Sequence, residues 1–116
     1  MSDLELGNFK IVVQTGKTTT LRWLGVSDIA IVSSEIDVFL DQCIDSFDGE
    51  LFVLDFQGLE YMHSSSVPVI VELLKKLNTA EITTQLVWEK TIFWQETTFR
   101  ALRRIGETLE HITITG

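Results

Sequence analysis

The chain has 116 residues, of which 45% are hydrophobic and 22% charged. This length suits one domain, and the apolar fraction excludes an intrinsically disordered or collagen-like chain. Nine basic residues face 17 acidic ones, and the net charge of −8 argues against broad contacts with nucleic acid or anionic membranes. The acidity lies mainly in residues 1–58, which carry ten acidic and three basic residues, while residues 59–116 carry seven and six.

The cellular location follows from two sequence observations. The residues after Met1 contain no apolar stretch typical of a signal peptide, and no apolar run is long enough to span a bilayer. The single cysteine, Cys43, cannot form an intramolecular disulfide. We therefore expect a cytoplasmic protein that uses no cofactor or metal and binds neither nucleic acid nor membranes.

Two strands joined by a turn are predicted first. Residues 9–13 alternate between apolar and polar or smaller side chains, and residues 20–24 are rich in β-branched and aromatic side chains. Gly16-Lys17-Thr18 between them resembles the end of a phosphate-binding loop. That motif requires a glycine where Ile11 stands, so a hairpin turn is favoured. Residues 29–32 are compatible with a short strand or with a packed loop.

An amphipathic helix is predicted from Ser33 to about Asp48, with Ser34 as its N-cap. Its apolar residues recur at spacings of three and four, which makes one buried stripe. The stripe consists of Ile36, Phe39, Leu40, Cys43, Ile44 and Phe47, while Asp37, Asp41, Asp45 and Asp48 lie on the opposite face. Cys43 is therefore expected to be inert and buried.

The rest of the chain alternates between strands and helices. Residues 51–56 form a continuous apolar run, which predicts a central strand covered on both faces. The remaining elements are a loop at 57–63, a helix after the serines that runs to about residue 78, a strand at 82–88, a helix at 94–107 and a strand at 112–114. This order predicts an α/β fold, a single layered domain with a mixed β-sheet covered by helices.

Most enzyme signatures are absent. No dinucleotide-binding glycine motif and no nucleophile elbow occur, and the two histidines have no cysteine nearby that would indicate a zinc site. His111 is expected at the surface near a strand end. His63 and Ser64 could be read as a base and a nucleophile, but adjacent side chains rarely point at each other and no orienting acid is evident.

The serines at 64–66 are the most informative feature, since they lie between a buried strand and a helix. One interpretation is that a serine caps the helix. The other is that a hydroxyl there accepts a phosphate, because a helix start tolerates negative charge while an exposed phosphate can repel a docked partner. The residue pattern leaves both interpretations open.

Residues 52–66, FVLDFQGLEYMHSSS, resemble the centre of STAS domains, the anti-sigma factor antagonist family. That family shows a hydrophobic strand ending in Asp, a short segment with a hydrophobic pair, and Asp-Ser-Ser-Gly opening a helix. The order of elements over residues 9–114 also looks like the STAS arrangement. His63 stands here in place of the family's Asp and Ser66 in place of its Gly, and Pro68 disfavours helical geometry at Val67.

The resemblance implies a partner-switching regulator. In STAS domains the first serine is phosphorylated by a kinase related to histidine kinases, which places the phosphate on Ser64, with Ser65 as the second candidate and otherwise a helix cap. Tyr61-Met-His-Ser-Ser-Ser66 is similar to a branch with Tyr-Leu-Asn-Thr-Ser-Ser, and Trp94-Gln95 and Phe99-Arg100-Ala101-Leu102 also resemble that branch. The implied partners are this serine kinase, a PP2C-type phosphatase, and an anti-sigma factor or a diguanylate cyclase.

The expected partner-binding surface extends beyond the serines. It comprises Gly58, Tyr61, Met62, His63, Ser65, Ser66, Pro68, Arg100 and Arg104. The arginines at 100, 103 and 104 are either a solvated face balanced by Glu96 and Glu107 or a docking patch for an acidic partner. The three tryptophans are expected to be buried or half-buried, with a possible interface role for Trp94. The alternative function is a constitutive STAS-like scaffold that is never phosphorylated.

Overall fold

A computed structural model describes residues 3–27 and 33–115 and shows one mixed β-sheet with three helices in this part of the chain. The helices are α1 (Ser33–Asp45), α2 (Val67–Thr79) and α3 (Phe93–Gly106). The strands are β1 (Leu4–Leu6), β2 (Phe9–Gln14), β3 (Thr18–Ser27), β4 (Leu51–Asp55), β5 (Leu59–Met62), β6 (Thr84–Val87) and β7 (Ile112–Thr115). The predicted mixed α/β architecture is confirmed, while residues 29–32 lie outside the described residues.

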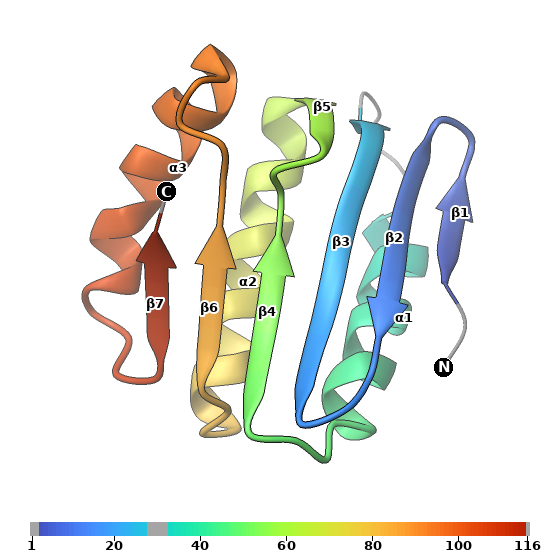
Figure 1. Cartoon of the computed structure of the whole chain (residues 1–116), viewed down its shortest axis with the longest axis vertical. Coiled ribbons are helices and arrows are strands. Elements are labelled where there is room, and N and C mark those ends of the chain that lie inside the picture. The colour runs from blue at the N-terminus through green and yellow to red at the C-terminus, as the bar shows by residue number, and fades with distance from the viewer. Residues whose placement is uncertain (1–2, 28–32, 116) are drawn as a thin grey trace.

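The sheet combines an antiparallel edge with a parallel centre. Its strand order is β1-β2-β3-β4-β6-β7, with β5 pairing β3 off this path. β1, β2 and β3 pair antiparallel, so Gly16 and Lys17 do form the predicted hairpin turn, and β3, β4, β6 and β7 pair parallel. Each parallel connection contains one helix, and Figure 1 shows α1, α2 and α3 on the same side of the sheet.

The hydrophobic core lies between the sheet and this helical layer. In β4, the side chains of Phe52 and Leu54 are fully buried, and so is Phe56 directly after the strand. The alternate residues Leu51, Val53 and Asp55 are only half-buried, so the prediction that this strand is covered on both faces is wrong. A continuous apolar run cannot reveal this, because Leu51 and Val53 are shielded by neighbouring strands without any helix above them.

The apolar stripe predicted for the first helix is confirmed at Ile36, Phe39, Leu40 and Cys43, which are buried, while Ile44 and Phe47 are half-buried. α2 buries Ile70, Leu73, Leu74 and Leu77, and α3 buries Phe99 and Leu102. Burial raises the pKa of the Cys43 thiol to about 11, as expected for an inert core cysteine. α1 ends at Asp45 rather than at Asp48, and the side chain of its predicted cap, Ser34, lies outside the described residues.

Two short strands were not expected. β1 extends the antiparallel edge, and β5 replaces part of the loop predicted at 57–63. β5 pairs with β3 beyond a bulge at Gly25 and Val26, where Gly25 has φ +84°. A Cβ at Gly25 would overlap the carbonyl oxygen of Asn8, so only glycine fits there. The long-range pairing that makes residues 59–62 a strand therefore depends on a distant glycine.

Candidate functional site

The serines lie at the edge of the sheet where the parallel strands end. β5 runs beside the last residues of β3, and Ser64–Ser66 form a 3₁₀ turn that leads directly into α2. Figure 1 shows β5 and the first turns of α2 and α3 at the same end of the molecule. In open α/β sheets, functional sites gather at this carboxyl end of the strands.

His63 caps the serine turn. Its backbone is extended, with φ −68° and ψ 145°, and its imidazole Nδ1 accepts the backbone N–H of Ser65 at 3.1 Å. The Ser65 hydroxyl oxygen lies 2.9 Å from the same nitrogen. Because Nδ1 accepts the N–H, the neutral ring carries its proton on Nε2, and the Ser65 hydroxyl is placed to donate to Nδ1. His63 therefore caps the start of this turn, as an Asp or Ser side chain caps the start of a helix.

The three serines have different environments. Ser65 is exposed but engaged with the imidazole, and Ser66 is half-buried. Ser64 is exposed, and among the described residues its hydroxyl takes part in no hydrogen bond. The imidazole therefore contacts Ser65 rather than Ser64, and the base–nucleophile pair that a hydrolase would need is not formed between His63 and Ser64.

β5 and the start of α3 are held together beside this turn. The indole N–H of Trp94 donates to the carbonyl oxygen of Glu60 at 2.7 Å, and its ring lies 6.4 Å from that of Tyr61, centroid to centroid. Tyr61 is 47% exposed, whereas Met62 is buried. Gly58 and Pro68 are exposed near the two ends of the segment. Of the partner-binding residues predicted in this segment, Met62 is the one whose side chain is buried, so it lies beneath the surface and does not form part of it.

Gln95 is a buried connector that the sequence reasoning did not assign a role. Its Nε2 donates to the carbonyl oxygens of Phe56 and Leu59 at 2.8 and 2.9 Å, and its Oε1 accepts the Glu89 N–H at 2.8 Å. It therefore ties the β4–β5 connection to the segment before α3. A signal was available, since Gln95 shares the spacing of four and three with Phe99 and Leu102 on the buried stripe of α3.

The comparisons with known proteins agree with this topology. No protein-family model and no curated protein sequence matches the chain. Among solved structures, the unphosphorylated form of the anti-sigma factor antagonist SpoIIAA has a TM-score of 0.63 at 18% identity, covering 93% of this chain and 87% of that chain. The chain has a STAS-like fold. The phosphorylated Bacillus SpoIIAA (TM-score 0.64, 18% identity, 93% and 91% covered) and an anti-sigma factor antagonist from Mycobacterium paratuberculosis (0.65, 12%, 95% and 90%) are similar in the same way.

The arginines of this STAS-like domain are partly used within the fold. Arg100 pairs with Glu96 at 2.6 Å, and the Glu96 carboxylate also accepts the indole N–H of Trp88 at 3.0 Å. The Trp88 hydrogen bond, and then Arg100, lower the pKa of Glu96. The Arg103 guanidinium lies 5.1 Å from the centre of the Trp88 ring.

The structure does not gather these arginines with the serines. Trp94 reaches β5, but Arg100 and Arg104 lie six and ten residues further along α3, about 9 and 15 Å along the helix axis. Both are exposed. They form a separate outer face of α3 rather than part of the serine surface.

The three tryptophans and His111 differ in how deeply they are buried. Trp23 and Trp88 are buried and Trp94 is half-buried, as expected, and His111 is half-buried directly before β7.

Within residues 3–27 and 33–115, no group of three or more His, Cys, Asp or Glu side chains is placed to hold a metal ion. No described helix is long and apolar enough to cross a membrane.

Proposed function

We propose that this protein is a regulator without catalytic activity of its own, and that phosphorylation of Ser64 controls which protein it binds. In the dephosphorylated state it binds a serine kinase of the histidine-kinase-like type and, in alternation, an anti-sigma factor or an output enzyme such as a diguanylate cyclase. A PP2C-type phosphatase returns it to this state. The binding surface comprises Gly58, Tyr61, His63, Ser64, Ser65, Ser66 and Pro68.

The environment of Ser64 carries the proposal. It is an exposed residue of the turn, and its hydroxyl makes no hydrogen bond within the described residues. A kinase can therefore reach this oxygen without breaking a contact, whereas modification of Ser65 would disrupt its contact with His63. Ser64 also begins the turn that leads into α2, where the helix start favours negative charge.

The structural neighbours support the same function. Two of them are SpoIIAA in its unphosphorylated and phosphorylated forms, so this fold is used by an anti-sigma factor antagonist that exists in both states. SpoIIAA is only 18% identical to this chain, so its likeness supports the fold and does not by itself support a function. The serine turn in the predicted place is what extends the likeness to function.

A phosphate on Ser64 would act through local charge. It adds nearly two negative charges to a half of the chain whose formal charge is close to zero. The turn around it is anchored by the His63 cap, by the Ser66 N–H to the His63 carbonyl at 2.9 Å, and by α2. We therefore expect the phosphate to repel an acidic or closely packed partner surface without refolding the domain.

Intact-mass measurement of the protein isolated from its native cells tests this proposal. We expect a fraction that carries one phosphate in the wild type and in a Ser65→Ala control, and none in Ser64→Ala. In pull-downs with a purified partner, Ser64→Ala and the phosphomimetic Ser64→Asp should show opposite binding. Equal binding of both variants, or a protein never found phosphorylated, would instead indicate a constitutive scaffold. A serine-reactive phosphonate should leave Ser64 unlabelled.

A further inference from the structure

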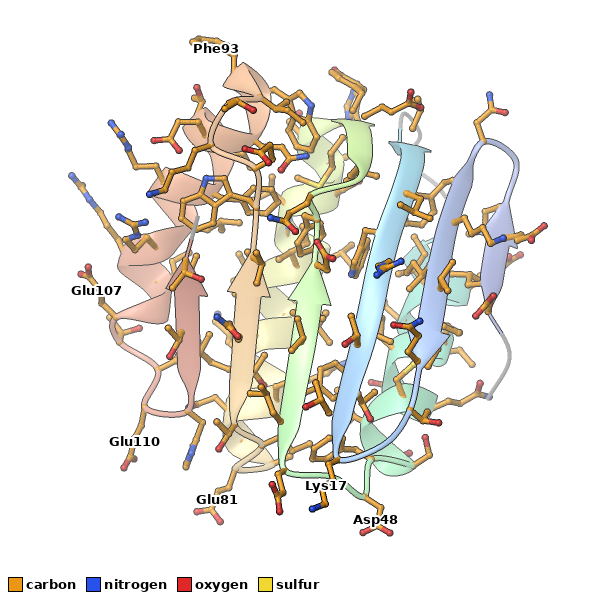
Figure 2. All side chains as sticks on the ribbon, in the orientation of Figure 1. Lys17, Asp48, Glu81, Phe93, Glu107 and Glu110 are labelled. Carbon is orange, nitrogen blue, oxygen red and sulfur yellow. The ribbon has the colours of Figure 1, made fainter. Side chains whose placement is uncertain are left out.

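Phe93 is an exposed aromatic side chain on a rigid support. It is the first residue of α3 and is 85% exposed, and Figure 2 shows it pointing away from the molecule at the end opposite Lys17 and Asp48. The next two residues are firmly held, since Trp94 donates to Glu60 and Gln95 makes three buried hydrogen bonds. The phenyl ring is therefore exposed to solvent, and the hydrogen bonds of the next two residues fix the backbone that carries it.

A shallow apolar groove lies between β1 and α1. It has a volume of about 450 Å³ and is lined by Leu4, Glu35, Val38, Phe39 and Gln42. Val38, in the wall of the groove, is 58% exposed although it is a large apolar side chain. The groove is open to solvent, and its wall is mainly apolar through Leu4, Val38 and Phe39, so it offers a surface on which a phenyl ring can lie.

The two features lie on different edges of the molecule. Figure 1 shows α1 behind the strands β1 to β3 and α3 beside β7, at the other edge of the sheet. Because both helices are fixed to the sheet, Phe93 cannot enter the groove of its own chain. A second copy of the chain can supply the ring.

The charges of the two helices are complementary. α1 carries Glu35, Asp37, Asp41 and Asp45 and no basic residue, while α3 carries Arg100, Arg103 and Arg104 against Glu96. In a chain with a net charge of −8, α3 is therefore a local positive region. Glu35, which lines the groove, is the carboxylate that α3 can meet when Phe93 docks, because Asp37 borders α2 and Asp41 is paired with Lys76. Charge complementarity also selects a direction, α3 of one copy against α1 of the next.

We propose that the protein self-associates head to tail, with Phe93 of one molecule seated in the β1–α1 groove of the next. Such a contact joins two different surfaces, so each molecule keeps one free ring and one free groove and the chain of copies can grow. A single aromatic anchor supports weak association, so short oligomers form as the concentration rises. The groove lies at the other edge of the sheet from the Ser64 switch surface, whereas Phe93 adjoins that surface because its neighbour Trp94 contacts Glu60 and Tyr61.

Sedimentation velocity over loading concentrations from about 20 µM to about 1 mM tests the proposal, because weak single-anchor contacts dissociate in this range. We expect the weight-average mass of the wild type to rise with concentration. Phe93→Ser, which removes the ring, and Val38→Glu, which fills the groove with a charge, should each stay monomeric. Both positions are exposed, and unchanged thermal melts will show that both variants fold.

An equimolar mixture of the two variants separates this contact from other modes of association. Phe93→Ser keeps the groove and Val38→Glu keeps the ring, so the mixture should form one-to-one dimers and nothing larger. Lys17→Ser, at the end of the molecule opposite Phe93, should associate like the wild type. A wild type that stays monomeric throughout, a Phe93→Ser variant that associates like it, or a mixture without dimers would overturn the proposal.

Discussion

The buried amide of Gln95 offers a sharp test of how the site is held in place. Replacing it with leucine keeps a similar volume inside α3 but removes all three of its hydrogen bonds. The Phe56 carbonyl keeps a second partner, the Leu59 N–H at 3.0 Å. The main losses therefore fall on the Leu59 carbonyl and the Glu89 N–H, which lose their bond to this amide.

The expected destabilisation follows from these contacts. A buried hydrogen bond contributes about 1 kcal/mol, and a buried group left without a partner costs about 1–3 kcal/mol. The buried Leu59 carbonyl left without this partner costs about 1–3 kcal/mol and the loss of the part-buried Glu89 bond about 1 kcal/mol, so Gln95→Leu should lower the free energy of unfolding by about 2–4 kcal/mol. For a domain near this size, that corresponds to a melting temperature lower by roughly 8–16 °C.

Urea unfolding followed by circular dichroism measures this difference directly. Gln57→Leu is the matched control, because Gln57 is exposed in the adjacent turn, and we expect its effect to stay within about 0.5 kcal/mol. A loss below about 1 kcal/mol in Gln95→Leu would refute the reasoning, since it would mean that these bonds are replaced by others. Increased hydrogen exchange at β5 should accompany the loss if Gln95 positions that strand.

Three further predictions concern single residues. His63→Ala should lower the free energy of unfolding by about 1 kcal/mol in urea titrations while His63→Asp retains most of it, because Asp also accepts the Ser65 N–H; equal losses would show that the imidazole is not a cap. Bonding to Trp88 lowers the pKa of Glu96, so its carboxylate stabilises the fold above its ordinary value of 4.5 and this stabilisation is lost as the pH falls toward the lower folded-state value. Melting curves from about pH 3 to 7 should therefore show a shallower acid limb for Glu96→Gln than for the wild type, and parallel curves would contradict this. Since burial raises the pKa of Cys43 to about 11, a thiol reagent at about pH 8 should label it only in denaturant, and rapid labelling of the folded protein would show that the core is open there.

Much of the architecture could be read from residue patterns. The spacing of three and four in α1 identified its buried face, because a helix turns once in 3.6 residues and this helix has one side on the core. The hairpin and the order of strands and helices were also predictable. A phosphate-accepting hydroxyl among residues 64–66 could be proposed from their place between a buried strand and a helix, and Ser64 in particular from the resemblance to STAS domains.

The tertiary structure decided the features that depend on distant residues. β5 exists because a bulge at Gly25 lets β3 pair with it, and β4 has one open face because α1, α2 and α3 lie on one side of the sheet. Gln95 links segments 36 and 39 residues apart in the chain. Periodicity reports only which face of an element is apolar, and it says nothing of which element packs against that face.

The two halves of the site show the same division. The sequence by itself determined that three serines precede a helix in a chain whose acidity lies elsewhere. Only the folded chain decided that His63 caps the turn through Ser65 and leaves Ser64 exposed, because side-chain hydrogen bonds depend on backbone angles that no residue pattern specifies. The same holds for Phe93, whose exposure results from where α3 begins rather than from its apolar character.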